Sequence, residues 1–530
     1  MTATIQTTDI IGAGTAFTFA ANGDSLFVLE GVTLASTADV TIQGNSNSLH
    51  VDGTIISGDD TSIRLFGYSS GSTISIGETG VVRSGADAQG GAFIDASNVD
   101  LVSSGQLHND GQIVSPRAIG VMMADASNYL TNTGTIIGAT GVYMGFDTVG
   151  EFGWGAGYDT LVNSGFISGT LQVYTEATNS ERHGVYSTGD GTHITNEAGG
   201  VIAGVGNLGT GITIGSGTSI GGGNGSVVIN HGTITADEYW AIDFFPMRGG
   251  DRAELFNTGI VSGERGSFRG NQTGEQVTNS GTMIGQVDMD QGDDTLTNSG
   301  LIDGDVFLGI GADTYEGLAD GAVTGTVYGM NLNDTMRGSE ANDSFDAGSG
   351  NDLVDGRGGD DSLRGWTGND LISGNTGNDT MTGDAGADTL NGGQGNDLID
   401  GGEDADVIRG GQGDDIIIGG LGRDILFGEE GIDRFVFLSV AESPVGGAVR
   451  DAIRDFEQGI DYVDLTAIGG GALDFLGSAS FSTASGPAFR VVTTAAGSTV
   501  VQVDADGDGA RDMEILVQFV PNMTADDFLF

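Results

Sequence analysis

Twelve aspartates recur at intervals of nine residues between Gly329 and Phe437, and this spacing is the clearest chemical signal in the sequence. Each occupies the sixth position of a nine-residue unit. Three consecutive units starting at residue 392 read GGQGNDLID, GGEDADVIR and GGQGDDIII. The aspartates are Asp334, Asp343, Asp352, Asp361, Asp370, Asp379, Asp388, Asp397, Asp406, Asp415, Asp424 and Asp433. The regular carboxylates, set beside glycine-rich turns, predict a series of cation sites.

Glycines at the first, second and fourth positions of these units are the other candidate site residues. Glycine accepts positive φ, so the chain can turn tightly and expose carbonyl oxygens beside the carboxylate. The most regular candidates are Gly392, Gly393, Gly395, Gly410, Gly411, Gly413, Gly419, Gly420 and Gly422. Oxygen ligands in a flexible loop suit Ca²⁺ better than Zn²⁺, which prefers nitrogen and sulfur. Because Leu332 and Ala341 replace the fourth glycine, as Asp404 does later, we expect the first two units to be the least complete metal sites.

The eighth position of every unit is apolar, and this residue indicates how the turns pack against one another. The last three residues of a unit are too short for an independent strand, so they must stack on other turns with the apolar residue inward. Two units then form one coil with a strand on each side. Aspartates eighteen residues apart become neighbours along the stack, where they repel one another unless cations lie between them.

The array resembles the RTX nonapeptide repeat, Gly-Gly-x-Gly-x-Asp-x-apolar-x. That resemblance implies a parallel β-roll that binds several Ca²⁺ ions. The alternative is a disordered linker rich in glycine and aspartate, but a linker has no reason to keep an apolar residue at every ninth position.

Composition narrows the possible partners of the 530-residue chain. It has 73 acidic and 18 basic residues, all arginine, for a net charge of −55. Nucleic acid and anionic membranes are therefore unfavourable partners. No segment has the roughly 20 apolar residues needed to span a bilayer, so membrane insertion is not expected. With no cysteine, metal binding and stacking must take the place of disulfides.

A looser repeat precedes the array, with the core Asn-Ser/Thr-Gly-x-Ile-x-Gly. It begins at Asn132, Asn163, Asn257, Asn279 and Asn298. A constant strand-turn motif with insertions of variable length is typical of a parallel β-helix. Stacked asparagines could hydrogen-bond along such a helix. Gly/Asp turns that end in Asp159, Asp294 and Asp313 sit inside this repeat, and predict one nearly continuous solenoid.

The stretch 438–530 lacks the regular array. Its segments DAIRDFEQGIDYVDL (451–465) and VDADGDG (503–509), with the final DDFLF, resemble the C-terminal domain of serralysin-type secreted proteins. The resemblance implies an uncleaved type I secretion signal. The N-terminus lacks the features of a secretory signal peptide. The zinc-protease motif His-Glu-x-x-His is absent, so this is not a serralysin protease. Asp504, Asp506 and Asp508 mimic the start of an EF-hand loop, but Ile515 stands where that loop needs Glu. One Ca²⁺ in a hairpin, or a solvated turn, is favoured instead.

Two insertions could carry an active site, because some β-helix proteins are polysaccharide lyases or epimerases. One holds Tyr174, Glu176, Arg182, His183, Tyr186, Asp190 and His193. The other holds Glu238, Tyr239, Trp240, Asp243, Phe244, Phe245, Arg248, Asp251, Arg252, Arg265 and Arg269. The alternative, which we favour, is that their aromatic residues pack on the solenoid and their arginines pair with surplus acids.

The sequence therefore predicts an all-β protein: a right-handed parallel β-helix over 1–328, with insertions near 140–160, 174–193 and 238–269. An RTX β-roll over 329–437 and a small C-terminal β-rich cap over 438–530 follow. We expect a secreted or cell-surface, calcium-binding structural or adhesive protein, exported by type I secretion machinery, with extracellular polysaccharide or copies of itself as partners. The alternative is a carbohydrate-active β-helix enzyme. No catalytic residue is assigned.

Overall fold

The computed structural model describes residues 3–6, 10–12, 17–19, 25–36, 40–43, 47–57, 63–66, 72–84, 97–102, 105–115, 119–124, 128–145, 159–169, 183–187, 192–205, 210–214, 225–244, 252–318, 320–470, 473–481 and 486–530. Within these residues the regular structure is strand, apart from two short 3₁₀ helices, η1 (Ile468–Gly470) and η2 (Ala525–Asp527). The predicted all-β fold with parallel strands is confirmed. No described helix is long and apolar enough to cross a membrane.

The chain forms two compact units. The first contains residues 1–296 and 300–304, and the second contains 297–299 and 305–530. Strand β32 (Thr295–Asn298) spans the change from one to the other. The predicted boundary at 328 lies inside the second unit, and the roll and the C-terminal stretch belong to one unit. The expected continuity of the solenoid between the two units stays a prediction.

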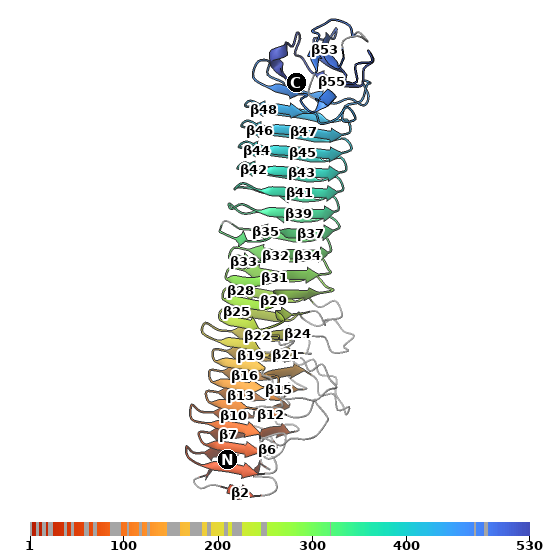
Figure 1. Cartoon of the computed structure of the whole chain (residues 1–530). Helices are drawn as coiled ribbons and strands as arrows, with labels where there is room; N and C mark the ends of the chain where they lie inside the picture. Colours follow the sequence, from red (N-terminus) through yellow and green to blue (C-terminus); the bar gives the residue numbers. More distant parts are fainter. Residues whose placement is uncertain are drawn as a thin grey trace. The chain divides into compact units, whose positions relative to one another are not determined.

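The first unit is a parallel stack with three columns of strands, and neighbours in a column pair in parallel register (Figure 1). The first column is β1 (Ala3–Gln6), β4 (Ser25–Val28), β7 (Ser48–Val51), β10 (Thr73–Ile76), β13 (Gln106–Asn109), β16 (Tyr129–Asn132), β19 (Thr160–Asn163), β22 (His193–Asn196), β25 (Val227–Asn230), β28 (Glu254–Asn257) and β30 (Gln276–Asn279). The second is β2 (Ile10–Gly12), β5 (Thr33–Ser36), β8 (Thr54–Ser57), β11 (Val81–Ser84), β14 (Gln112–Val114), β17 (Thr135–Gly138), β20 (Phe166–Gly169), β23 (Val201–Gly204), β26 (Thr233–Ala236), β29 (Ile260–Asn271), β31 (Thr282–Asp290) and β33 (Leu301–Asp303). The third is β3 (Phe17–Phe19), β6 (Val40–Gln43), β9 (Ile63–Phe66), β12 (Ser97–Val102), β15 (Ile119–Ala124), β18 (Val142–Gly145), β21 (Val185–Ser187), β24 (Ile212–Ile214) and β27 (Trp240–Asp243), continued by the long strands β29 and β31.

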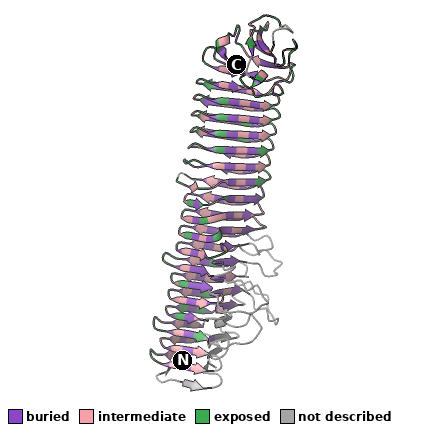
Figure 2. Cartoon of the chain, viewed as in Figure 1, coloured by how far each residue is buried: buried purple, intermediate pink, exposed green. Residues whose placement is uncertain are grey.

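The asparagine that opens the looser repeat ends each first-column strand from β13 to β30 and is buried. Asn163 Nδ2 donates to Asn196 Oδ1 at 2.8 Å, and Asn196 Nδ2 donates to Asn230 Oδ1 at 2.9 Å. The same bond recurs at every described step from Asn109 to Asn279. Inward apolar residues such as Leu161 and Ile194 alternate with half-buried ones along the strands (Figure 2). The expected asparagine ladder is therefore present, and it satisfies amides that would be costly to bury alone.

The second unit has two columns of parallel strands. One is β35 (Thr314–Gly317), β38 (Thr335–Arg337), β40 (Leu353–Asp355), β42 (Leu371–Thr376), β44 (Thr389–Gln394), β46 (Val407–Gln412), β48 (Ile425–Glu430) and β50 (Ala452–Ile453). The other is β34 (Val306–Ile310), β37 (Val327–Asn331), β39 (Ser344–Ser349), β41 (Ser362–Thr367), β43 (Thr380–Ala385), β45 (Leu398–Glu403), β47 (Ile416–Leu421), β49 (Arg434–Val436) and β51 (Tyr462–Asp464). The short strand β36 (Ala322–Val323) completes the unit's upstream part. Residues eighteen apart are register partners, as in Ile399 with Ile417, so two nonapeptides form one coil as expected.

The C-terminal residues close the end of the roll. Strands β53 (Ala488–Thr493), β54 (Thr499–Asp504) and β55 (Met513–Val517) form an antiparallel sheet, and β52 (Asp474–Phe475) pairs with β53. Strand β55 pairs in parallel with β50, and the terminal strand β56 (Phe528–Leu529) pairs in parallel with β51. Both edges of the last coil are thereby covered, which removes unpaired strand edges.

Candidate metal centre

The turns of the array place each aspartate just before the strand that carries its inward apolar residue. Strands run from the seventh position of one unit through the third of the next, six residues in β45. They are longer than the three residues predicted, because the first three positions also pair with the coils on either side. Ile399 and Ile417 are fully buried, so the apolar stack holds the turns in register.

Positive φ occurs at the second and fourth positions of the units, and not at the first as the sequence suggested. Gly393 has φ 113° and Gly395 has φ 124°, whereas Gly392 is not in this region. Gly411, Gly413 and Gly420 also have positive φ, while Gly410, Gly419 and Gly422 do not. The second position also holds Trp366 at φ 75°, so the stack imposes this geometry on residues other than glycine.

The first glycine is required for a different reason, namely space beside the carboxylate. A methyl group on Gly392 would lie 2.2 Å from Asp397 Oδ2 and 2.4 Å from the carbonyl oxygen of Gly410 in the next coil. The first-position glycines Gly401, Gly410 and Gly419 face the carboxylate of their own unit in the same way. The turns at Gly392, Gly401 and Gly410 therefore each hold a small space bordered by a carboxylate oxygen and by a carbonyl from the neighbouring coil, and the turn at Gly419 holds one bordered by its carboxylate.

The aspartates form two ladders along the roll, one on each side. The N–H of Asp379 donates to Asp397 Oδ1 and the N–H of Asp397 donates to Asp415 Oδ1, each at 2.8 Å. The same bond joins the other aspartates eighteen residues apart, at 2.7 to 3.0 Å. One oxygen of each carboxylate from Asp352 to Asp433 is therefore fixed by the backbone of the preceding coil, and Asp334 Oδ1 accepts the N–H of Asp313 at 2.8 Å in the same way.

The second oxygen, Oδ2, is buried and has no hydrogen-bond partner in eleven of the twelve units. These oxygens belong to Asp334, Asp352, Asp361, Asp370, Asp379, Asp388, Asp397, Asp406, Asp415, Asp424 and Asp433. A buried carboxylate oxygen without a donor is costly unless it binds a cation. The carbonyl and carboxylate oxygens around each space are hard ligands of the kind that Ca²⁺ prefers, so the residues present fit this ion.

Asp343 is the exception among the twelve. Its Oδ2 accepts the backbone N–H of Ser339 at 2.7 Å and the Ser339 hydroxyl at 3.3 Å. This unit is one of the two expected to be least complete. The other, that of Asp334, keeps its open oxygen despite Leu332 at the fourth position.

Burial raises the pKa of the ladder carboxyls, and the charge of the neighbouring aspartates raises it further, while N–H donors lower it. The pKa is about 8 for Asp334, Asp361, Asp406 and Asp424, about 7 for Asp352, Asp388 and Asp415, and about 6 for Asp397 and Asp433. Without metal the ladder therefore retains protons near neutral pH. A divalent cation would displace them and stabilise the charged form.

The family model for the RTX calcium-binding nonapeptide repeat matches residues 328–363, 365–399 and 400–435. This region is an RTX calcium-binding repeat array. Because RTX repeats bind Ca²⁺, calcium is the cofactor of this chain, in several copies, and the predicted calcium-binding β-roll is confirmed. Such repeats are typical of secreted proteins.

Two solved structures are among the similar chains. The AlgE6R3 subunit of the Azotobacter vinelandii mannuronan C5-epimerase is 24% identical, with 40% of this chain and 86% of that chain covered and a TM-score of 0.18. The AlgE6R2 subunit of the same enzyme is 25% identical, with 32% of this chain and 88% of that chain covered and a TM-score of 0.17. TM-scores this low carry no argument about function. No curated protein matches this chain.

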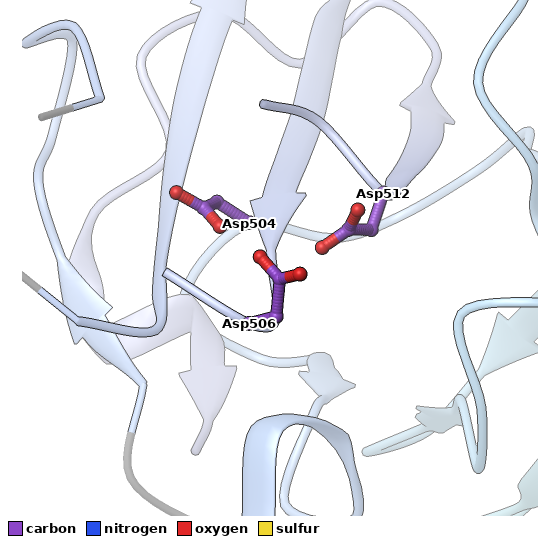
Figure 3. Close-up of side chains that lie close together, drawn as sticks. All are labelled: Asp504, Asp506 and Asp512. Carbon is purple, nitrogen blue, oxygen red and sulfur yellow. The ribbon is translucent and has the colours of Figure 1, made fainter. Parts of the chain in front are cut away.

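The EF-hand-like segment is the turn of a β-hairpin between β54 and β55, as expected. Asp504, Asp506 and Asp512 bring carboxylate oxygens within 4.8 Å of one another (Figure 3), and Asp508 is not part of this group. Three backbone N–H groups, of Gly507, Asp508 and Gly509, already donate to Asp504 at 2.7 to 3.1 Å. These hydrogen bonds hold the acidic turn closed through its own backbone.

The described residues of the insertion near 238–269 pack and pair among themselves. Arg269 donates from Nε and Nη2 to the two oxygens of Asp243, at 2.9 and 2.6 Å. The guanidinium groups of Arg265 and Arg269 lie 5.3 to 5.9 Å from the ring centroids of Tyr239 and Trp240. This is the arrangement expected if the insertion serves packing and charge pairing. Phe245, Arg248 and Asp251 lie outside the described residues.

In the insertion near 174–193, the His183 ring stacks on Tyr186 with centroids 4.7 Å apart, and its Nδ1 lies 2.9 Å from the Thr213 hydroxyl. Tyr174, Glu176, Arg182 and Asp190 lie outside the described residues, as does most of the insertion near 140–160. Convergence of the two insertions on one groove therefore stays a prediction.

The structure adds two carboxylates that the site prediction left out. Asp451 and Asp461 accept the N–H groups of Asp424 and Asp433, at 2.8 and 3.1 Å, and so extend the two ladders beyond the array. The signal was available, because Gly446, Gly447, Asp451 and Ile453 fit positions one, two, six and eight of the repeat. The stretch between 437 and 446, which keeps no such glycines, concealed it.

Proposed function

We propose that this protein is an extracellular, calcium-dependent structural or adhesive protein whose roll assembles on ion binding. The observation that carries the proposal is the set of eleven buried carboxylate oxygens without a donor, arranged in two ladders. Each has a high energetic cost in the metal-free chain, and the free energy of ion binding becomes free energy of folding. Such coupling suits a protein that folds only where calcium is plentiful.

A structural role is supported by how the polar groups of the described residues are used. The asparagine ladder satisfies the first unit internally, and Asp243 is fully engaged by Arg269. These groups hold the stack together. We propose copies of the same chain or extracellular polysaccharide as partners of the elongated strand faces.

Circular dichroism and light scattering of the full chain test this proposal. We expect β-structure to increase when millimolar Ca²⁺ replaces a chelator, because the ladders then become neutralised. Association with further copies or with polysaccharide should require the calcium-loaded chain. Equal β-content in calcium and in chelator would contradict the proposal, whereas calcium-dependent folding without any association would limit it to the roll.

We further propose that the chain leaves the cell through type I secretion machinery, using its C-terminal residues. The terminal residues also have a folded role: Asp527 accepts N–H bonds from Thr524 and Gly459 at 2.7 and 3.0 Å, and Phe528 is buried. Truncation would therefore damage both folding and export. Asp526 is exposed and Phe530 is 43% exposed, with its ring 5.0 Å from that of Phe489, so changing these two residues disturbs folding less than truncation does.

The double variant Asp526→Ala and Phe530→Ala should accumulate inside the producing cell, while the purified variant should refold with calcium as the unchanged chain does. Phe528→Ala is the control for folding, because it removes a buried ring from the cap. Unchanged export of the double variant would argue against a signal in these residues.

A further inference from the structure

The buried carboxylates from Asp334 to Asp461 fall into two kinds, which differ in one hydrogen bond. In a closed rung, the second carboxylate oxygen accepts the backbone N–H of the residue four positions earlier. Closed rungs are Asp343 with Ser339 at 2.7 Å, Glu442 with Leu438 at 2.9 Å and Asp461 with Glu457 at 2.7 Å. In an open rung this oxygen is buried and has no donor. Open rungs are the eleven aspartates of the array named above, together with Asp451.

The backbone of the second position explains the difference within the array. In the open units it has positive φ, as at Gly393 and Trp366, whereas Ser339, four residues before Asp343, is not in this region. In the closed unit the N–H of Ser339 reaches the carboxylate instead. The open oxygen therefore marks a turn that offers its space to a cation, and the closed oxygen marks one that needs none.

Asp451 is an open rung outside the residues that match the repeat. It is fully buried, and the N–H of Asp424 donates to its Oδ1 at 2.8 Å, as in the ladder of the array. Pro444 explains why this rung comes 27 residues after Asp424 and not eighteen. It stands at the eighth position of the intervening unit, where it has no N–H for a ladder, so that unit leaves the stack as a turn.

Three buried acids meet at this junction. Asp424 is 0% exposed, Asp451 is 0% exposed and Glu442 is 6% exposed. The N–H of Asp424 donates to Asp451 Oδ1 at 2.8 Å, and the N–H of Asp451 donates at 2.8 Å to the hydroxyl of Ser443, which follows Glu442 in the chain. Gly419 leaves space beside Asp424 Oδ2, where a methyl group would come within 2.7 Å. Two open carboxylate oxygens and a third acid in one buried region are an unfavourable arrangement unless a cation binds.

We propose that Asp424 and Asp451 hold a further Ca²⁺ ion, with Glu442 adding negative charge beside it. This site rests on the proposed function, because it takes the same ion as the array. It differs in joining the array to the C-terminal stretch: Asp451 precedes β50, and β50 pairs with β55 of the C-terminal sheet. Calcium at this junction would therefore fasten the terminal sheet to the last coil. Asp461, on the other side of the roll, is closed and should hold no ion.

The test compares Asp451→Asn with Asp461→Asn in the full chain. Asparagine keeps the oxygen that accepts the ladder N–H and replaces Oδ2 by an amide nitrogen, which repels a cation. Calorimetric titration with Ca²⁺ and native mass spectrometry at saturating calcium should count one ion fewer in Asp451→Asn than in the unchanged chain. Asp461→Asn should keep every ion.

An unchanged ion count in Asp451→Asn, or the loss of one ion from both variants, would overturn the assignment. If Asp451→Asn does not fold, Glu442→Gln takes its place: it keeps the acceptor for Leu438 and removes only the charge. It should weaken one ion at least tenfold, and unchanged affinities for all ions would overturn the site. Absence of calcium binding by the unchanged chain would instead refute the proposed function as a whole.

Discussion

Replacing Asp397 by Asn should remove calcium-dependent stability without harming the metal-free chain. Asn keeps the oxygen that accepts the Asp379 N–H, so the ladder bond remains, but the open Oδ2 becomes an amide nitrogen. Loss of an outer-shell partner of a metal costs about 10- to 100-fold in affinity, so loss of a ligand should cost at least about tenfold, or 1.4 kcal/mol. Because Asp397 lies between Asp379 and Asp415 in its ladder, two ions should be affected, for about 3 kcal/mol or more.

In the metal-free chain, the effect of Asp397→Asn on stability should have the opposite sign. Burial raises the pKa of Asp397 from 3.8 to about 6, so above pH 6 the folded state pays for a charge that the unfolded state solvates freely. The shift corresponds to about 3 kcal/mol, which solvent screening reduces to about 1–2 kcal/mol. Asp397→Asn removes this cost and should not lower the stability of the chain in chelator.

Thermal unfolding at pH 7.5, in saturating Ca²⁺ and in chelator, measures both effects. At about 2–4 °C per kcal/mol for a unit of this size, the variant should melt at least about 6 °C lower in calcium. Asp400→Asn is the matched control, since it removes the same charge from the same nonapeptide at an outward, half-buried position. Equal melting temperatures and ion counts for the two variants would refute the assignment of the ladder as the metal centre.

Three further outcomes follow from the described geometry. The pKa values of the metal-free ladder lie above the ordinary aspartate value, so the ladder destabilises the folded state more as pH rises from about 4 to about 8. Circular dichroism in chelator should therefore show more β-structure at pH 4.5 than at pH 8. No difference between the two pH values would contradict this expectation. Asn196→Ala removes two hydrogen bonds of the asparagine ladder. The free energy of unfolding, measured by thermal unfolding, should fall by about 2–3 kcal/mol, equally with and without calcium. A calcium-dependent loss would be inconsistent with a ladder that needs no ion. Gly395 has φ 124°, and a methyl group added there by Gly395→Ala would lie 1.8 Å from the carbonyl oxygen of Gly377. The variant should therefore have a lower melting temperature and a lower calcium affinity than the unchanged chain. An unaffected protein would show that the turn geometry is wrong.

The spacing of residues in the sequence predicts only those features that the nine-residue period determines. Aspartates nine residues apart, with an apolar residue two positions later, require stacking in coils of eighteen, and Asp397 indeed lies between Asp379 and Asp415. Within the array, the state of the second oxygen was not predictable, because it follows the φ of the residue four positions earlier. Ser339 avoids positive φ whereas Trp366 adopts it, although neither is glycine.

Contacts between coils of unequal length also could not be predicted from the sequence. The pairing of Arg269 with Asp243 depends on the register of β27 on β29, which sets these two residues opposite each other. The insertions differ in length from coil to coil, so no fixed period relates these positions. The asparagine ladder was easier to anticipate, because one asparagine ends each first-column strand from β13 to β30 whatever the length of the loops between them.

The closed rungs bear on the order in which the roll can assemble. A coil whose carboxylate is satisfied by its own backbone can form before any ion arrives, whereas an open coil must wait for calcium. Asp343 lies near the start of the array and Asp461 just beyond its end, so every open rung except that of Asp334 lies between two rungs that need no metal. Such coils would serve as nuclei on which the first ions find a preformed neighbour. Folding could then proceed inward from both ends, and the slow step of starting a repetitive stack would not fall on the calcium sites themselves.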